Sequence, residues 1–220
     1  LDTTDVVRSS IEEVLFTLFE TTALVIFVIF LFLQNWRATL IPCLTIPVSL
    51  IGTLAVMQLL GFSINTLTLF GLILAIAIVV DDAIVVVENV TRILDGERLP
   101  PKEATEKAMS EITSPIVGVV LVMMAVFIPT TTIGGISGEL YKQFALTIAT
   151  ATLLSGFNSL TLTPALSALL LRPTKKGKEG WFFHLFNKAY DAVQRVYDRC
   201  VAFLLRHAWI AATSFAAMVA

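Results

Sequence analysis

The sequence contains little charge, little histidine and little cysteine. Only 15% of its 220 residues are Asp, Glu, Lys or Arg, whereas a soluble domain carries about 25%. The two cysteines, Cys43 and Cys200, show neither the spacing of a metal site nor that of a disulfide framework. The net charge of −2 is too small to indicate a nucleic-acid partner. We therefore expect no bound metal, no disulfide framework and no nucleic acid.

Two further features are missing from the sequence. Gly134, Gly135 and Gly138 form a permissive turn but do not have the spacing of a phosphate-binding loop. The chain starts at Leu1 without an initiator Met or a cleavable signal pattern, and its last residues lie within an apolar run. We expect the chain to be a fragment of a longer protein.

Apolar residues are abundant. They make up 56% of the chain, and the mean hydropathy is +0.85, more apolar surface than so small a globule can bury. A membrane-spanning helix needs about 20 predominantly apolar residues. Five stretches qualify: residues 14–33, 38–60, 64–90, 115–131 and 144–171. A sixth begins near Val201 and is cut short. The sequence therefore predicts an all-α, polytopic transmembrane helix bundle.

The basic residues predict how the bundle is oriented. If the five stretches cross a membrane, 13 of the 15 Lys and Arg residues fall on one side, and only Arg8 and Lys142 fall on the other. The positive-inside rule assigns the richer side to the cytoplasm.

Residues 180–201 have a different pattern, with apolar side chains at helical spacing and charged ones largely on the opposite face. This pattern is typical of an amphipathic helix lying on the cytoplasmic membrane surface, although a linker helix packed on the bundle would show it too. We therefore divide the chain into three parts: transmembrane helices in 1–172, a cytoplasmic linker and surface helix in 173–200, and the start of a further transmembrane helix in 201–220.

Two adjacent acids, Asp81 and Asp82, stand inside the otherwise apolar third stretch. A carboxylate within a membrane costs several kcal/mol unless it is paired, solvated or neutralised, so it indicates a functional site. We interpret the pair as a coupled proton-carrying unit. Alternatively, the pair neutralises a cation from another helix. No Lys or Arg lies in the middle of a predicted span, so such a cation would come from outside these 220 residues.

Helical spacing predicts the surroundings of the two acids. Gly71 and Ala75 lie on the face of Asp82, where small residues let another helix approach closely. Ala77 and Glu88 share the face of Asp81. We expect both acids to point into the protein.

Other polar residues within the spans are weaker candidates. Glu20 and Glu88 are possible members of a proton path, although a charge near the membrane interface is the favoured interpretation of each. Six further residues are candidates for hydrogen bonds between helices: Asn65, Ser155, Asn158, Ser159, Thr161 and Thr163.

Several segments resemble the hydrophobe/amphiphile exporters of the resistance-nodulation-division (RND) superfamily, the AcrB-like multidrug exporters. In chain order they are 32–42 (FLQNWRATLIP), 61–68 (GFSINTLT), 80–90 (VDDAIVVVENV), 100–105 (PPKEAT) and 162–166 (LTPAL). The resemblance covers nearly the whole chain and implies that it spans membrane helices 2–6, the surface helix and the start of helix 7.

The resemblance also implies a function. Members of this family exchange protons for hydrophobic or amphiphilic compounds, with protons as the coupling ion and no cofactor, and they are not enzymes. They form homotrimers in the bacterial inner membrane, and many work with a periplasmic adaptor and an outer-membrane channel. The motif places the family's proton-carrying aspartates at Asp81 and Asp82 and implies a lysine partner from the second half of the membrane domain.

Three alternatives remain at this stage. An intramembrane aspartyl protease needs two aspartates from separate helices, commonly with a Gly-x-Gly-Asp pattern, which this sequence lacks. A truncated membrane subunit would pack with other subunits and transport nothing. A relative within the superfamily would export lipid, metal or protein.

Overall fold

The computed structural model describes residues 3–173 and 181–207 and the single residues 209, 213 and 217. Within these residues the chain forms seven helices and no strand, which confirms the all-α prediction. Their bounds are α1 Thr3–Leu33, α2 Trp36–Leu59, α3 Thr66–Glu97, α4 Pro101–Thr130, α5 Ile136–Leu160, α6 Leu162–Leu170 and α7 Trp181–Arg206.

Five segments in the described part are long and apolar enough to cross a membrane, as the sequence predicted. They are Phe16–Leu33, Trp36–Leu59, Leu67–Glu97, Pro101–Thr130 and Gly138–Leu170. Four helices extend beyond the predicted apolar runs: α1, α4 and α5 at their starts and α3 at its end. Hydropathy detects only the apolar part of a helix, whereas the extensions of α3 and α4 carry the charged residues of a hairpin. The chain is therefore a multi-pass membrane protein.

Local signals set the ends of α3 and the start of α4. The side chain of Asn65 accepts a hydrogen bond from the Thr68 N–H at 3.0 Å, and the Thr68 hydroxyl accepts one from the Asn65 N–H at 2.8 Å, which forms a capping box. Arg98 ends α3 in the left-handed conformation, with φ of 54°. Pro101 then begins α4 at a position where its missing N–H has no cost.

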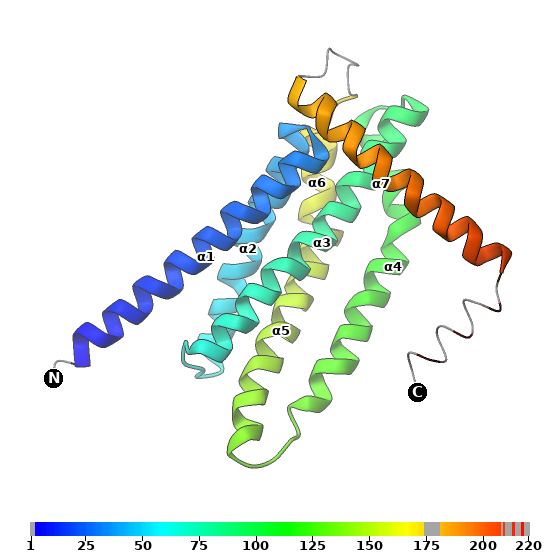
Figure 1. Ribbon diagram of the computed structural model, residues 1–220. Coiled ribbons are helices and arrows are strands. Elements are labelled where there is room, and N and C mark those ends of the chain that lie inside the picture. Colours follow the sequence, from blue (N-terminus) through cyan, green and yellow to red (C-terminus); the bar gives the residue numbers. More distant parts are fainter. Residues whose placement is uncertain (1–2, 174–180, 208, 210–212, 214–216, 218–220) are drawn as a thin grey trace. The chain divides into compact units, whose positions relative to one another are not determined.

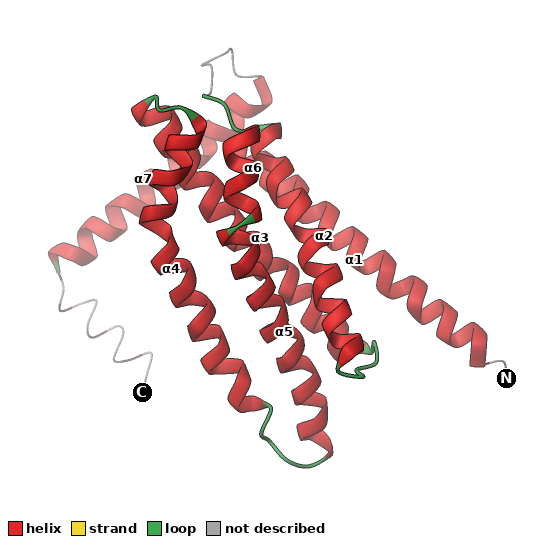
Figure 2. Cartoon of the chain, turned by 180° about the vertical axis from the view of Figure 1, so that it is seen from behind, coloured by secondary structure: helices red, strands yellow, loops and turns green. Residues whose placement is uncertain are grey.

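The last predicted span is a broken helix. Thr161 has φ of −126° and ψ of −70°, and it separates α5 from α6. Pro164 lies in the first turn of α6 and cannot donate a backbone hydrogen bond. Figure 2 shows the interruption as a short loop between two helices that follow one another. The sequence prediction had treated this stretch as one span.

Residues Leu1–Thr174 form one compact unit, and α3 is its central helix. It packs against α1, α2, α4, α5 and α6, most extensively against α5, as Figure 1 shows. The buried core contains two apolar clusters. One includes Ile46, Ile76 and Val79, and the other includes Ile41, Val86 and Leu171. The third span therefore packs against other helices along much of its length.

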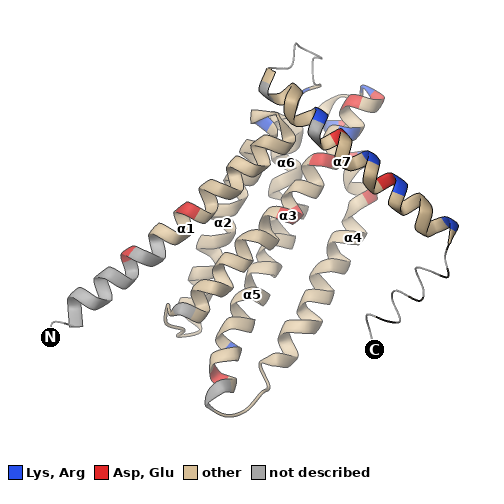
Figure 3. Ribbon diagram, in the orientation of Figure 1, with Lys and Arg blue, Asp and Glu red and all other residues tan. Residues whose placement is uncertain are grey.

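Basic residues in this unit gather at one end of the bundle, which we call the basic end. There α2 begins, α3 ends, α4 begins and α6 ends (Figure 3), and the basic residues are Arg37, Arg92, Arg98, Lys102, Lys107 and Arg172. Lys142 of α5 lies at the opposite end. The arrangement agrees with the sidedness expected from the sequence. The assignment of the basic end to the cytoplasm stays a prediction.

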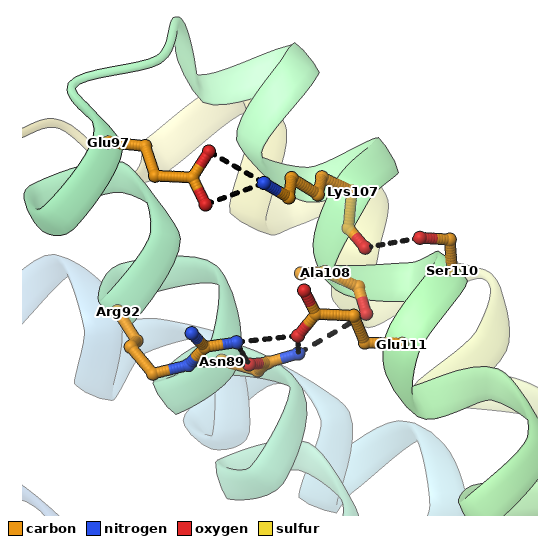
Figure 4. Close-up of polar contacts among 7 residues, drawn as sticks. All are labelled: Asn89, Arg92, Glu97, Lys107, Ala108, Ser110 and Glu111. Atoms are coloured by element: carbon orange, nitrogen blue, oxygen red, sulfur yellow. Dashed lines mark hydrogen bonds and ion pairs between the residues drawn. The ribbon is translucent and has the colours of Figure 1, made fainter.

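Ion pairs join α3 and α4 at the basic end (Figure 4). The Lys107 ammonium lies 2.6 and 2.7 Å from the two carboxylate oxygens of Glu97. The Arg92 guanidinium donates to the carboxylate of Glu111 at 2.5 Å and to the side chain of Asn89 at 2.6 Å. These contacts link the two helices of the hairpin that follows the span carrying the aspartates.

Residues Lys175–Ala220 form the second unit, whose main element is α7. Its charged residues include Lys188, Asp191, Arg195 and Arg199, and its apolar residues recur at helical spacing. The amphipathic helix predicted here is confirmed, and it continues to Arg206. Residues 174–180 of the predicted linker, and most of the predicted start of a further span, lie outside the described residues. The position of α7 on a membrane surface stays a prediction.

Candidate functional site

Asp82 is a buried acid in the middle of α3. Only 7% of its surface is exposed, and its carboxylate oxygen Oδ2 accepts a hydrogen bond from the hydroxyl of Ser155 on α5 at 2.6 Å. Asp82 lies between the two apolar clusters, since Val79 and Val80 belong to one and Val86 to the other. The acid is therefore held inside the protein by a neighbouring helix.

Small residues allow α5 to approach this part of the bundle closely. A Cβ atom on Gly71 of α3 would lie 3.3 Å from the Thr147 side chain of α5. A Cβ atom on Gly156, the neighbour of Ser155, would lie 2.5 Å from the Val120 side chain of α4. Ala75 is also buried. The packing role predicted for Gly71 and Ala75 therefore agrees with their positions.

Asp81 faces the other way. It is exposed, as are Ala77 and Glu88, which were expected on its face. Together with three apolar residues they form an exposed row along α3, which we call the α3 stripe: Phe70, Leu74, Ala77, Asp81, Val85 and Glu88. The expectation that both acids point into the bundle is therefore met by Asp82 alone. Ala77, predicted to pack near the site, is exposed within this chain. Consecutive helix residues point about 100° apart, so two adjacent acids reach different surroundings.

The other acidic candidates lie apart from Asp82. Glu20 is exposed on α1, and Glu88 is exposed on α3, about 10 Å along the helix axis from Asp81 at 1.5 Å per residue. Among the described residues, no hydrogen bond or ion pair joins either of them to Asp82. Their place in a proton path stays a prediction.

A second polar contact lies near Asp82, between α2 and α5. The side-chain amide of Asn158 donates to the hydroxyl of Ser49 at 2.7 Å, and both residues are buried. Ser49 was not among the residues singled out from the sequence, although it is a lone serine in an apolar run. Asn65 also bonds between helices, to Gln143 at 3.0 Å. The hydroxyl of Thr161 instead bonds to the carbonyl of Phe157 in its own helix.

A small cavity of about 10 Å³ lies among α2, α3 and α5, close to the smallest volume that holds one water molecule. Ser49 and Thr53 supply its polar wall, and Ala75, Val79 and Ala151 are among its apolar lining. Val79 is one turn before Asp82 on α3, on the side away from the basic end. The cavity is therefore placed between Asp82 and the opposite end of the bundle.

The described residues contain no group of three His, Cys, Asp or Glu side chains that could hold a metal ion. The site consists of one buried acid, hydroxyl and amide groups from neighbouring helices, and a second acid on an exposed stripe. Such a site can bind or release a proton.

The sequence matches a known protein family and several known transporters. The model of the AcrB/AcrD/AcrF family matches residues 1–220, the entire chain. The chain is 51% identical over 207 residues to the multidrug export protein AcrF of Escherichia coli strain K12, covering 93% of this chain and 20% of AcrF. It is 49% identical over 210 residues to the toluene efflux pump membrane transporter TtgB of Pseudomonas putida, covering 94% and 20%.

The multidrug resistance protein MdtF of Escherichia coli strain K12 is 46% identical over 207 residues. The chain thus spans about a fifth of the length of each of these relatives, which are named as export or resistance proteins.

Proposed function

The chain belongs to the AcrB/AcrD/AcrF family of RND efflux transporters, and from this membership we propose that it is the membrane part of a proton-driven exporter. In this proposal, protonation and deprotonation of the Asp81/Asp82 pair drive the conformational cycle of a proton/drug antiporter. The exported compounds are hydrophobic or amphiphilic. The relatives named for multidrug and toluene export support this substrate class.

The observation that carries the proposal is the burial of Asp82 in an apolar span. In the part of the chain that the structure describes, no Lys or Arg pairs with Asp82, and its hydrogen bond comes from the neutral hydroxyl of Ser155. An unpaired carboxylate costs several kcal/mol within a membrane, and the protonated acid avoids this cost. Gain or loss of one proton therefore changes which arrangement of the helices is stable.

Asp81 has a complementary role in the proposal. It is exposed on the α3 stripe between the apolar residues Leu74 and Val85. An acid in such a setting needs a partner of opposite charge. A lysine from the second half of the membrane domain, approaching the stripe, would supply this charge. Glu20 and Glu88 would then line the way by which protons reach or leave the pair.

The remaining features follow from the family. We propose a homotrimer in the bacterial inner membrane that works with a periplasmic adaptor and an outer-membrane channel. The protein would use protons as the coupling ion, no cofactor and no enzymatic step. The cavity beside Ser49 supports proton entry from the end opposite the basic end, because it has room for one water molecule and a polar wall.

The test uses a full-length transporter that carries this segment. Asp82→Asn and Asp81→Asn remove the exchangeable proton but keep the shape of the side chain. We expect each to abolish dye efflux from cells and drug-coupled proton flux in proteoliposomes, with normal expression and assembly. Glu106→Gln, at an exposed position on α4, is the control and should transport normally. Normal efflux in Asp82→Asn at normal expression would refute the proposal and favour a non-transporting membrane subunit.

A further inference from the structure

Buried hydroxyl groups form a row that begins at Asp82 and runs toward the basic end. Ser155 donates to Asp82, and further hydroxyl residues follow it at intervals of four along α5 and α6: Ser159, Thr163 and Ser167. At most 1% of each of these four residues is exposed. Four-residue spacing places Ser155 and Ser159 on one side of α5, and Thr163 and Ser167 on one side of α6. We call this set the hydroxyl row.

Most buried hydroxyls in this bundle have an ordinary structural use. Thr147 and Thr152 of α5 donate to the backbone carbonyls of Gln143 and Ile148, four residues earlier, at 2.7 and 2.9 Å. This back-bonding satisfies a hydroxyl within its own helix. Ser167 does the same with the carbonyl of Thr163 at 2.8 Å. A buried hydroxyl that does not bond to the carbonyl four residues earlier therefore needs another explanation for its position.

The Thr163 hydroxyl makes no hydrogen bond to a backbone carbonyl of its own helix. Thr163 is fully buried, and its hydroxyl oxygen is the one buried side-chain nitrogen or oxygen atom without a hydrogen-bond partner among the described residues. A buried polar atom without a partner costs about 1–3 kcal/mol. In native proteins such an atom commonly marks an ordered water molecule or a functional role.

The break between α5 and α6 explains why Thr163 is left without a partner. The backbone angles at Thr161 end the regular hydrogen-bond pattern of α5, and the first bond of α6 runs from the Ala165 N–H to the Thr161 carbonyl at 3.2 Å. The first N–H groups of a helix have no partner within it, and Pro164 has no N–H. The Thr163 hydroxyl thus lies in the first turn of α6, where the helix itself supplies no partner and where a water molecule would satisfy it.

We propose that the hydroxyl row, bridged by water molecules, carries the proton released by Asp82 to the basic end of the bundle. Within α5 and within α6, residues four apart are separated by about 6 Å along the axis, about two hydrogen-bond lengths, which is the distance that one bridging water molecule spans. The inference rests on the proposed function, since it needs Asp82 to release a proton.

The proton balance of this route is simple. The Asp82 carboxyl group loses its proton and becomes a carboxylate. Each oxygen along the row accepts a proton through a lone pair and passes its own proton to the next oxygen. A bulk water molecule at the basic end receives one proton for each proton that Asp82 releases. The hydroxyls are unchanged after the row has reoriented.

The test compares two threonines of equal burial in the full-length transporter. Thr163→Val removes the hydroxyl of the row and keeps the shape of the side chain, whereas Thr163→Ser keeps the hydroxyl. Thr152→Val is the matched control, because its hydroxyl is satisfied within its own helix. Drug-coupled proton flux would be measured in proteoliposomes in H₂O and in D₂O.

We expect Thr163→Val to slow proton flux about tenfold, because added water replaces the lost hydroxyl only in part. Its solvent isotope effect should rise, as expected when proton transfer limits the rate. Thr163→Ser and Thr152→Val should match the unchanged protein in both readouts. Equal slowing in Thr163→Val and Thr152→Val would show a structural effect and overturn the inference, as would an unchanged rate in Thr163→Val.

Asp82→Asn in the same assay tests the proposed proton site separately from the proposed hydroxyl row. If Asp82→Asn stops coupled flux and Thr163→Val leaves it unchanged, the proton site stands and the hydroxyl row is wrong. If Asp82→Asn leaves coupled flux intact, the proposed function itself fails, and the row loses its source of protons.

Discussion

The Ser155 hydroxyl donates to the Asp82 carboxylate at 2.6 Å across the contact between α5 and α3. Through this bond the buried acid is attached to a second helix. A change in the charge of Asp82 alters the strength of this bond, because hydrogen bonds to ionised groups are about twice as strong as neutral ones. In the proposed cycle, protonation of Asp82 would therefore alter the contact between α3 and α5.

The first prediction concerns this bond. Ser155→Ala removes the donor, and a hydrogen bond to a charged group contributes about 1.5–3 kcal/mol. If that energy is used in the transport cycle, the rate of proton-coupled efflux falls about ten- to a hundredfold. Efflux by a full-length transporter carrying the change would be measured beside Thr45→Val, whose lost hydroxyl bonds only to the Pro42 carbonyl. Equal rates for the two variants would show that the Ser155 bond has no part in transport.

The second prediction concerns the buried pair Ser49 and Asn158. Ser49→Val leaves the Asn158 amide without its acceptor, which should destabilise the protein by about 1–3 kcal/mol. Asn158→Leu combined with Ser49→Val replaces both polar groups by apolar ones and should cost less than the two single changes added together. Thermal unfolding of the purified protein in detergent measures the three variants. Strict additivity would mean that the 2.7 Å bond contributes no coupling energy.

The third prediction concerns the contact of Gly156 with Val120. Gly156→Ala places a methyl group about where the Val120 side chain lies, and such overpacking costs about 1–3 kcal/mol. Val120→Ala in the same molecule makes room and should recover most of the loss. The melting temperatures of the single and double variants test this relief. Gly118→Ala is the control, because its added Cβ meets nothing within 4 Å.

The fourth prediction is a small effect. Glu97 and Lys107 form close contacts, but each side chain is more than two-fifths exposed, and exposed ion pairs contribute about 0–1 kcal/mol. Glu97→Gln should therefore lower stability by less than about 1 kcal/mol, and high salt should remove the difference. A loss of more than about 2 kcal/mol would indicate that the pair at the basic end is more shielded from water than its exposure implies.

The sequence predicted the spans well, because five apolar runs are long enough to leave little choice of structure in a membrane. The break at Thr161 was not predicted. Hydropathy does not depend on backbone angles, and a proline such as Pro164 is tolerated within spanning helices. The sequence likewise missed the charged extensions of α3 and α4, since neither is apolar.

The candidate site was predicted in part. The small residues Gly71 and Ala75 are buried on α3, as is Asp82. Asp81 is exposed within this chain, so its expected interior position stays a prediction. Helical spacing shows which residues share a face but not which neighbours cover that face. Ser155 was recognised as a hydrogen-bonding residue, but its bond to Asp82 depends on how α3 and α5 pack.

The adjacent positions of Asp81 and Asp82 divide one helix between two sets of neighbours. The residue that bonds to Asp82 is encoded in this chain, so substitutions at Ser155 alter its surroundings directly. The surroundings of Asp81 are determined by whatever surface covers the α3 stripe. The two acids can therefore diverge in evolution by separate routes, one through this segment and the other through a surface that meets it.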